Sequence, residues 1–423
     1  MTSADTHRTI DAVWRIESPR IIAGIARMVH DLGLAEELAQ DALVAALEQW
    51  PASGIPDNPG AWLTAAAKHR AIDHFRRNKR LEKKHQELRH QHEGQQRVPD
   101  YDSVLDDEIG DDLLRLVFTA CHPVLSSEAR VALTLRLLGG LTTAEIARAY
   151  LIQEATVAQR IVRAKRTLTE NRVPFEVPRG EELASRLSPV LEVIYLIFNE
   201  GYTATGGSDW TRPALCEEAL RLGRILAELV PKEPEVHGIV ALMEIQASRS
   251  RARVSVSGEP ILILDQNRAL WDQLLIQRGL AGLERAQKLG GVHGTYTLQA
   301  AIAACHARAL AAEETDWERI AALYAELAHL MPSPIVDLNR AVAIAMAFGP
   351  QAGLALVDQL ALEPALQSYH LLPSVRGDLL TKLGRFGEAH GEFERAAALT
   401  RNARERQLLL ERAEHAHAEQ NRR

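Results

Sequence analysis

Apolar residues return at spacings of three and four along almost the whole chain, and this periodicity limits what the chain can fold into. It begins near Asp11 and persists to about Trp50. Because an α-helix has 3.6 residues per turn, such spacing places the apolar side chains on one side of a helix. The stretch from Pro51 to Pro59 is rich in proline, so we expect a loop there, followed by a helix from about Pro59 to Lys84. The sequence therefore predicts an all-α fold.

The composition agrees with helices and with more than one domain. Of the 423 residues, 46% are hydrophobic and only 5% are aromatic. Ala, Leu, Glu and Arg, which favour helices, recur throughout. One core rarely extends over so long a chain, and a length of about 150 residues per domain predicts roughly three domains. The first is expected at residues 1–84.

Residues 85–110 are rich in Gln, His and Asp and poor in large apolar groups. This composition predicts a flexible linker, because such a segment cannot bury enough apolar surface to fold. Its histidines, His85, His90 and His92, are interpreted as solvated rather than metal-binding, since neither a Cys nor a folded frame accompanies them.

The cysteines and the chain's hydropathy point to the compartment. Cys121, Cys216 and Cys305 are far apart and odd in number, which argues against a disulfide framework and against a paired-cysteine zinc site. Neither a metal nor another cofactor is expected. The N-terminus lacks a signal pattern, and no uncharged apolar run approaches membrane-spanning length. We therefore expect a soluble, cytoplasmic protein with no membrane partner.

A pair of short helices is predicted within residues 111–173. Thr142 and Glu145 have the spacing of a capping box, which favours a helix beginning there. After a turn near Ile152, a second helix from about Gln153 to Leu168 has its apolar residues on one side. Its other side carries Arg, Gln and Thr, which suit a major groove because Arg pairs with guanine and Gln with adenine. The pattern indicates a helix-turn-helix, although an ordinary helical hairpin with a solvated basic face also fits it.

Positive charge is concentrated in two places, although the formal net charge of the chain is -7. One cluster runs from Lys68 to Lys84 and the other from Arg160 to Arg166. Both can neutralise phosphates, yet charge alone fits a solvated helix face equally well. The motifs around each cluster must therefore decide its role.

From residue 180 to residue 423 the chain again reads as successive helices separated by Gly and Pro. The segment from Gly377 to Ala396 matches one tetratricopeptide-type helix pair, but a shift of about 34 residues upstream retains only Ala343 and Ala355. A large helical domain like tetratricopeptide repeats is expected, without a regular array. Because such surfaces usually bind proteins or peptides, a protein or peptide ligand is expected as well.

Taken in order, the first two domains resemble those of extracytoplasmic-function sigma factors of the sigma-70 family. The stretch from Ala35 to Ala42 is similar to the family's helix that grips the clamp helices of the polymerase largest subunit. The stretch from Pro59 to Arg77 is similar to the helix that faces the minus-10 promoter element, and Thr143 to Arg166 is similar to the helix-turn-helix that reads the minus-35 element. The resemblance implies sigma region 2 at residues 1–84 and sigma region 4 at residues 111–173.

The resemblance also implies which residues form three interfaces. Those for the polymerase core enzyme are Glu36, Glu37, Gln40 and Asp41. Those for minus-10 DNA are Lys68, His69, Arg70, Asp73, Arg76, Arg77 and Arg80. Those for minus-35 DNA are Thr143, Glu154, Thr156, Gln159, Arg160 and Arg163. One departure is His69, where the family usually has Asn, although a ring N–H still donates a hydrogen bond.

The rest of the chain looks like the subgroup of these factors that carries a tetratricopeptide-like extension. The stretches that carry this likeness are residues 196–207 (LIFNEGYTATGG) and 298–306 (LQAAIAACH). The resemblance implies a protein that binds core polymerase, recognises promoter DNA and promotes transcription initiation. The fused C-terminal domain would regulate the two sigma domains in the same chain.

Three other functions remain open at this stage. Residues 199–212 gather polar and aromatic groups in one loop, but no glycine-rich phosphate loop, metal-binding histidine pair or nucleophile elbow is present, so an enzyme is not expected. A conventional helix-turn-helix regulator with a C-terminal sensor domain would leave the acidic and basic stretches of the first domain unexplained. A scaffold of helical repeats would leave the basic helices without a use.

Overall fold

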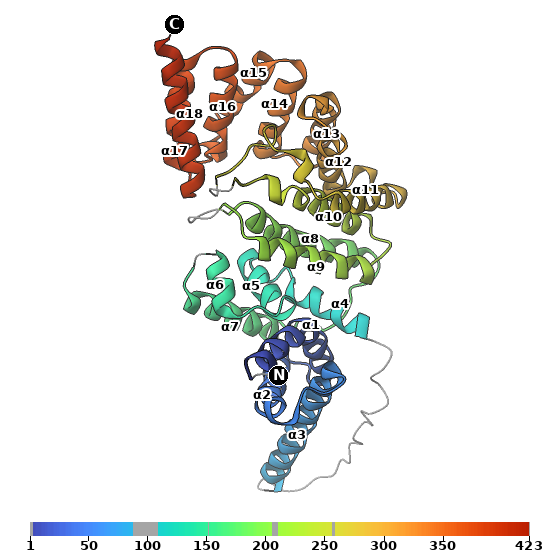
Figure 1. The fold of residues 1–423 in the computed structure, drawn as a ribbon. Coiled ribbons are helices and arrows are strands. Elements are labelled where there is room, and N and C mark those ends of the chain that lie inside the picture. Colours follow the sequence, from blue (N-terminus) through green and yellow to red (C-terminus); the bar gives the residue numbers. More distant parts are fainter. Residues whose placement is uncertain (1–2, 88–108, 151, 205–209, 256–258, 423) are drawn as a thin grey trace. The chain divides into compact units, whose positions relative to one another are not determined.

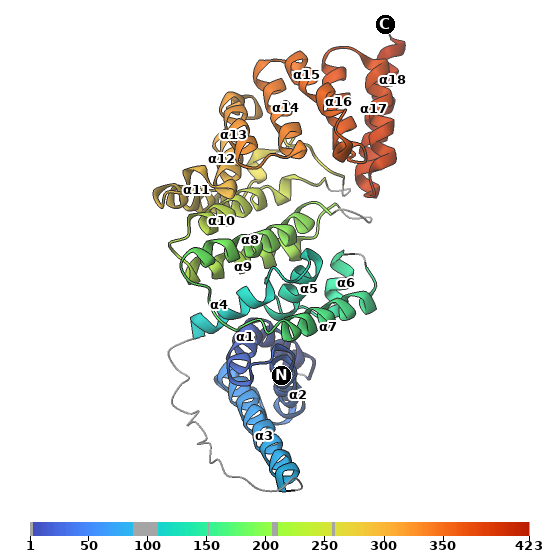
Figure 2. The ribbon, with the colours of Figure 1, turned by 180° about the vertical axis from the view of Figure 1, so that it is seen from behind.

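The computed structural model describes residues 3–87, 109–150, 152–204, 210–255 and 259–422. Within these ranges the chain forms the helices α1 to α18 and five 3-10 helices, and pairs as a β-bridge only between Val254 and Pro260. Figure 1 and the reverse view in Figure 2 show this all-helical build, which confirms the predicted fold class. None of these helices is long and apolar enough to cross a membrane. The chain divides into two compact units, residues 1–194 and 195–423.

Three helices form the first bundle of the first unit: α1 (Ser3–Val29), α2 (Leu32–Ser53) and α3 (Pro59–Glu87). Each of them packs against the other two. Their shared core consists of Ile10, Ile21, Ile25, Leu38, Ala42, Trp50, Leu63, Ala67 and Ala71. Full burial of one large apolar side chain stabilises a fold by about 1.5–3 kcal/mol, so this packing, more than helix propensity, holds the bundle together.

Local sequence decides where these helices end, with two differences from the prediction. The helical stretch from Asp11 to Trp50 divides in two, because the Asp31 carboxylate accepts a hydrogen bond from the Leu34 N–H at 2.8 Å and caps α2. The predicted loop is shorter than the proline content suggested, since α2 continues through Pro51 to Ser53. Only the last turn follows Pro51, so a single ladder hydrogen bond is lost there. Gly54, with a φ of 87°, then ends the helix.

Four further helices make the second bundle of the first unit: α4 (Ile109–Ala120), α5 (Ser127–Leu137), α6 (Thr143–Tyr150) and α7 (Glu154–Glu170). The predicted capping box is present, because the Thr142 N–H donates to Glu145 Oε2 at 2.8 Å and the Glu145 N–H donates to Thr142 Oγ1 at 3.1 Å. The predicted inward face of α7 is also confirmed, since Val157, Ile161, Ala164 and Leu168 are all buried. The predicted linker at 85–110 is wrong at both ends, because α3 includes His85 and continues to Glu87 and α4 begins at Ile109; His90 and His92 lie outside the described residues.

Helix α8 (Glu181–Tyr202) begins in the first unit and ends in the second. The other α-helices of the second unit are α9 (Pro213–Leu229), α10 (Pro234–Ala247), α11 (Gln273–Lys288), α12 (Thr295–Arg308), α13 (Trp317–Leu330), α14 (Pro334–Phe348), α15 (Pro350–Leu360), α16 (Leu371–Lys382), α17 (Phe386–Leu399) and α18 (Ala403–Asn421). Its 3-10 helices are η1 (Ser250–Ala252), η2 (Arg268–Leu270), η3 (Gly291–His293), η4 (Ala312–Glu314) and η5 (Pro364–Leu366). From α12 onward each helix packs against the next one in the chain, as in helical repeat proteins.

The tetratricopeptide-type helix pair predicted from Gly377 to Ala396 corresponds to α16 and α17. Ala389, Phe393 and Ala396 of α17 are buried. A Cβ at position 377 would lie only 2.8 Å from the Phe393 ring, so glycine lets the two helices approach closely.

A side-chain hydrogen bond connects the beginning of the second unit with its last helix. Asn402, the N-cap of α18, donates from Nδ2 to the carbonyl oxygen of Ala204 at 3.1 Å, and both residues are buried. Ala204 lies two residues after the end of α8. Two segments separated by 198 positions are thereby fixed against each other.

The contact between Gly377 and Phe393 gives a stability prediction. Gly377→Ala forces the new methyl group against a buried ring and should lower the free energy of unfolding by about 1–3 kcal/mol. Gly391→Ala on α17 is the matched control, because a Cβ there meets nothing within 4 Å. The control should stabilise the helix by about 0.5–1 kcal/mol. Urea unfolding of both full-length variants, followed by circular dichroism, measures the difference, and equal midpoints would contradict the packing described.

Candidate nucleic-acid and polymerase interfaces

Helix α3 presents the side chains predicted for minus-10 DNA. His69, Asp73, Arg76 and Arg77 are exposed, and their spacing of three and four residues places them along one side of the helix. Arg76 lies 3.8 Å from Asp73. Because such exposed pairs contribute about 0–1 kcal/mol, they leave the guanidinium groups available to a phosphate.

The remaining minus-10 candidates are either half-buried on the same helix or have side chains that the structure does not describe. Lys68 and Arg70 are half-buried, and Arg70 is 3.9 Å from Asp41, a residue predicted for polymerase binding. Arg80 belongs to α3, but its side chain is outside the described part of the structure. All the minus-10 candidates therefore lie on α3, and one of them, Arg70, also lies close to Asp41 of α2.

Helix α7 presents the side chains predicted for minus-35 DNA. Glu154, Gln159 and Arg163 are exposed, and Thr156 and Arg160 are half-buried. Gln159 and Arg163 lie on the side away from the buried apolar residues of α7, whereas Glu154 and Arg160 lie at the border of that buried side. This arrangement has the form of a recognition helix, with an apolar side against its own domain and polar donors directed outward.

Helix α6 holds the start of α7 in place. The Thr143 hydroxyl donates to Glu154 Oε1 at 2.9 Å, so these two predicted DNA contacts are bonded to each other. Helices α6 and α7 pack together, and both also pack against α5. Packing and this hydrogen bond thus hold α6 and α7 together.

The four predicted polymerase contacts on α2 differ sharply in exposure. Glu37 and Asp41 are exposed and Gln40 is half-buried, whereas only 5% of Glu36 is exposed. The sequence placed all four on one helical stretch. It gave no sign that the first of them is covered.

The Glu36 carboxylate is covered by basic residues of the second bundle. Its Oε1 accepts from Arg136 Nε at 2.6 Å and from Gln40 Nε2 at 2.7 Å, and its Oε2 pairs with the Lys165 ammonium. Arg136 lies on α5 and Lys165 on α7. In this arrangement both carboxylate oxygens are occupied, and Glu36 is not accessible to a polymerase.

The protonation of Glu36 follows from these neighbours. Burial by itself would raise the pKa of the Glu36 carboxyl, but the Lys165 ammonium and the Arg136 guanidinium lower it below the ordinary value of 4.5. A carboxyl with a lowered pKa contributes its stabilisation above the unfolded-state value and loses it as the pH falls through the folded-state value. The contact between the two bundles is therefore fully formed at neutral pH.

Two further contacts join α1 to the second bundle. Arg27 Nε lies 3.3 Å from Asp112 of α4, and Arg15 pairs with Glu145 of α6. The turn before α6 also approaches α1 closely, because a Cβ on Gly140 would lie 3.4 Å from the Arg15 Cα atom. Charge pairs and close backbone packing thus hold the two bundles in a closed arrangement.

The loop considered as an enzyme site has a structural role. Glu200 is buried and pairs with Arg212, whose backbone N–H donates to the Gly201 carbonyl oxygen at 2.7 Å. A Cβ on Gly201 would lie 2.6 Å from the backbone nitrogen of Cys216. These groups join α8 to α9. Residues 205–209 of the same loop lie outside the described part of the structure.

Comparison with known proteins matches three parts of the chain to family models. Residues 14–81 match Sigma-70 region 2, residues 115–168 match Sigma-70 region 4, and residues 186–287 match a family of unknown function, DUF6596. An uncharacterized protein of Rhizobium meliloti, R00370, is 42% identical over 406 residues, which are 95% of this chain and 94% of that protein. The probable ECF RNA polymerase sigma factor SigI of Mycobacterium tuberculosis is 29% identical over 175 residues, 40% of this chain and 58% of that protein.

The two matched regions coincide with the two bundles of the first unit. The chain belongs to the sigma-70 family and is an RNA polymerase sigma factor. Within that family it is of the extracytoplasmic-function type, with regions 2 and 4 followed by a helical C-terminal extension. Members of this family are not enzymes, and their partners are the polymerase core enzyme and promoter DNA. A conventional helix-turn-helix regulator is not favoured.

The Glu36 contact predicts how the closed arrangement opens. Glu36→Gln removes the charge that Arg136 and Lys165 share and should weaken the contact by about 1.5–3 kcal/mol. Spin labels on cysteines introduced at the exposed positions Val44 and Val162 report the separation of α2 and α7 by pulsed electron resonance. We expect a longer and broader distance distribution in the variant.

The matched control is Glu37→Gln, an exposed carboxylate on the same turn, which should leave the distances unchanged. The three native cysteines are buried and should not take up label, because burial raises the pKa of Cys121 to about 11, that of Cys216 to about 12 and that of Cys305 above its ordinary value. An unchanged distribution in Glu36→Gln would mean that this carboxylate does not hold the bundles together.

Proposed function

We propose that the chain binds the core polymerase through the acidic side of α2 and reads a two-part promoter through α3 and α7. The observation that carries this proposal is the orientation of α7. It buries Val157, Ile161 and Leu168 while Gln159 and Arg163 remain exposed at one helical turn's spacing. These are the side-chain types that pair with adenine and guanine in a major groove.

The polymerase contact proceeds in two steps in this proposal. Glu37 and Asp41, which are exposed, meet the polymerase first. Glu36 and Gln40 follow when Arg136 and Lys165 leave the Glu36 carboxylate. The polymerase thus competes with region 4 for one negative charge, and binding would separate the two regions so that they span a promoter.

The promoter contact divides into positioning and reading. On α3 the residues proposed for minus-10 DNA are Lys68, His69, Arg70, Asp73, Arg76, Arg77 and Arg80, of which the arginines and the lysine neutralise phosphates. On α6 and α7 the residues proposed for minus-35 DNA are Thr143, Glu154, Thr156, Gln159, Arg160 and Arg163. The name of the mycobacterial relative, a probable ECF RNA polymerase sigma factor, supports the same assignment.

The C-terminal unit is the proposed regulatory part of the chain. Its stacked helices offer faces of the kind that bind a protein or a peptide. Fusion to the sigma regions keeps such a regulator at a high effective concentration. The chain would act in the cytoplasm, where its polymerase transcribes.

Arg163 gives the test of promoter reading. Arg163→Ala should weaken binding of the polymerase holoenzyme to a cognate promoter about 5- to 150-fold, corresponding to about 1–3 kcal/mol for a lost bidentate contact. Arg163→Lys keeps the positive charge but loses the paired N–H donors of the guanidinium group. It should therefore recover phosphate binding without base preference. Competition between the cognate promoter and one altered in the minus-35 element measures both effects. Equal discrimination by all three proteins would remove Arg163 from the reading role.

Glu37 and Asp41 give the test of polymerase binding. The double change Glu37→Lys and Asp41→Lys should reduce core binding at least tenfold, because it reverses two exposed charges without disturbing the buried core. Full-length protein reconstituted with core polymerase should initiate specifically, and the double variant should not. If the unaltered chain binds duplex promoter DNA tightly without polymerase and never initiates, the sigma assignment fails.

A further inference from the structure

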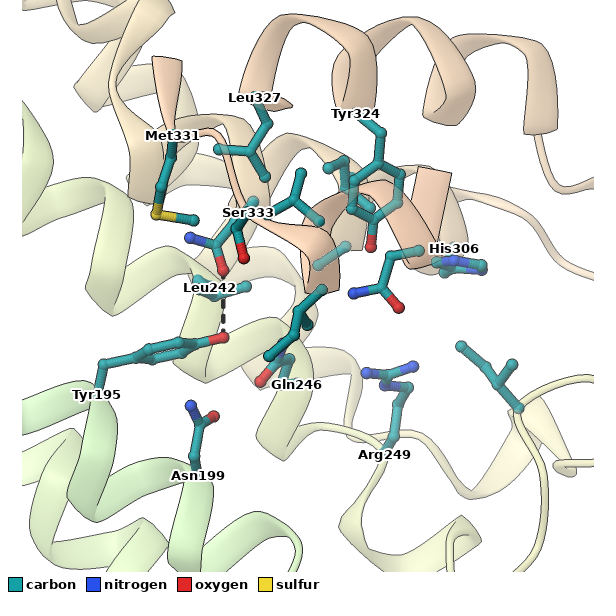
Figure 3. Close-up of a pocket in the computed structure, with 17 residues that line it drawn as sticks. Tyr195, Asn199, Leu242, Gln246, Arg249, His306, Tyr324, Leu327, Met331 and Ser333 are labelled. Atoms are coloured by element: carbon teal, nitrogen blue, oxygen red, sulfur yellow. Dashed lines mark hydrogen bonds between the residues drawn. The ribbon is translucent and has the colours of Figure 1, made fainter. Parts of the chain in front are cut away.

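The second unit contains a pocket that the promoter and polymerase interfaces do not use. Its volume is about 470 Å³, within the range of about 300–1,000 Å³ typical of small-molecule sites. Residues of α8, α10, α12, α13 and α14 line it, together with the segment after α10. Figure 3 shows Gln246 and Arg249 on one side of the pocket and Tyr324 and Ser333 reaching in from the opposite side.

Arg249 brings a positive charge to this pocket without a matching negative charge. No Asp or Glu is among the described residues that line the pocket. Its guanidinium lies 5.8 Å from the ring centroids of both Tyr202 and Trp271, and its Nε atom is buried without a hydrogen-bond partner in the described structure. Since a buried guanidinium N–H that lacks an acceptor is unfavourable, an anion is the group that would complete this site.

Gln246 and His306 also have buried polar atoms without a hydrogen-bond partner in the described structure. These atoms are Gln246 Oε1 and His306 Nδ1. Burial, together with the positive charges of Arg249 and Arg268, lowers the pKa of His306 to about 3, so its ring is neutral at physiological pH. The imidazole packs edge-on against Trp317, with 5.1 Å between ring centroids, which fixes its orientation. The pocket therefore offers acceptor and donor atoms beside the positive charge.

The rest of the wall is aromatic and apolar. The Tyr195 hydroxyl donates to Gln299 Oε1 at 3.2 Å, and burial raises the pKa of Tyr324 to about 12, so Tyr324 is a neutral donor. The apolar part of the wall consists of Leu242, Ile302, Leu327 and Val336. A ligand that fills this space needs an apolar body as well as polar groups.

We propose that this pocket binds a small organic carboxylate that carries an amide or hydroxyl group and an apolar body. The carboxylate lies against Arg249, the neutral polar group bonds Gln246 and His306, and the apolar body contacts the Leu242 and Leu327 side of the wall. The site lies within the second unit. The proposed ligand site therefore does not depend on the promoter and polymerase assignments, and failure of one would not affect the other.

The test uses two pairs of probes in which a carboxylate is replaced by a neutral carboxamide: hippurate with hippuramide, and N-acetylphenylalanine with its carboxamide. Binding to the full-length protein is measured by ligand-observed nuclear magnetic resonance and by calorimetry. We expect each acid to bind at least tenfold more tightly than its amide. Arg249→Gln should abolish that preference, and Arg251→Gln, an exposed arginine outside the pocket, should retain it.

Arg249→Lys keeps the charge and guards against a folding defect in the glutamine variant. It should bind the acids more weakly than the unaltered chain while still preferring them to the amides, and circular dichroism checks that each variant is folded. Three results would overturn the proposal. They are no binding of either acid at millimolar concentration, equal binding of acid and amide, or an undiminished preference in a folded Arg249→Gln protein.

Discussion

The first unit depends on one buried carboxylate shared between two domains. Glu36 belongs to the helix proposed for polymerase binding, yet its partners, Arg136 and Lys165, belong to region 4. A buried charge is strongly unfavourable without partners, so the two regions stay together until another basic or polar surface replaces those partners. The helix that supplies Lys165 still exposes Gln159 and Arg163. The closed arrangement of the two bundles therefore buries Glu36, which is proposed to bind the polymerase, but leaves Gln159 and Arg163, which are proposed to bind the promoter, exposed.

The sequence predicted those features of the fold that depend on interactions between residues close together in the chain. The periodicity of apolar residues predicted the helices, and Thr142 with Glu145 predicted where α6 begins. The same reasoning could not find the two charged partners of Glu36, which lie 100 and 129 positions away. Lys165 stood out only as one member of a basic cluster, because charge patterning records no distance between helices. The extension of α2 through Pro51 was missed for a related reason, since the packing of Trp50 into the core outweighs the local preference of proline.

The pocket of the second unit was also invisible to sequence reasoning. Tyr195, Gln246, Arg249, His306 and Tyr324 come from four helices and one connecting segment and share no motif. Their chemistry appears only once the fold brings them together. What the sequence did provide was a stretch, residues 298–306, whose last member, His306, proves to line the site.

The hydrogen bond from Asn402 to Ala204 changes how the second unit can lose structure. An open repeat array loses its terminal helix with little effect on the far end, because each repeat touches only its neighbours. Here the cap of the last helix satisfies a buried carbonyl beside α8, so fraying of α18 leaves that carbonyl unpaired. The start of the last helix is thereby coupled to the segment that follows α8, so loss of α18 would also remove a contact at the other end of the unit's sequence.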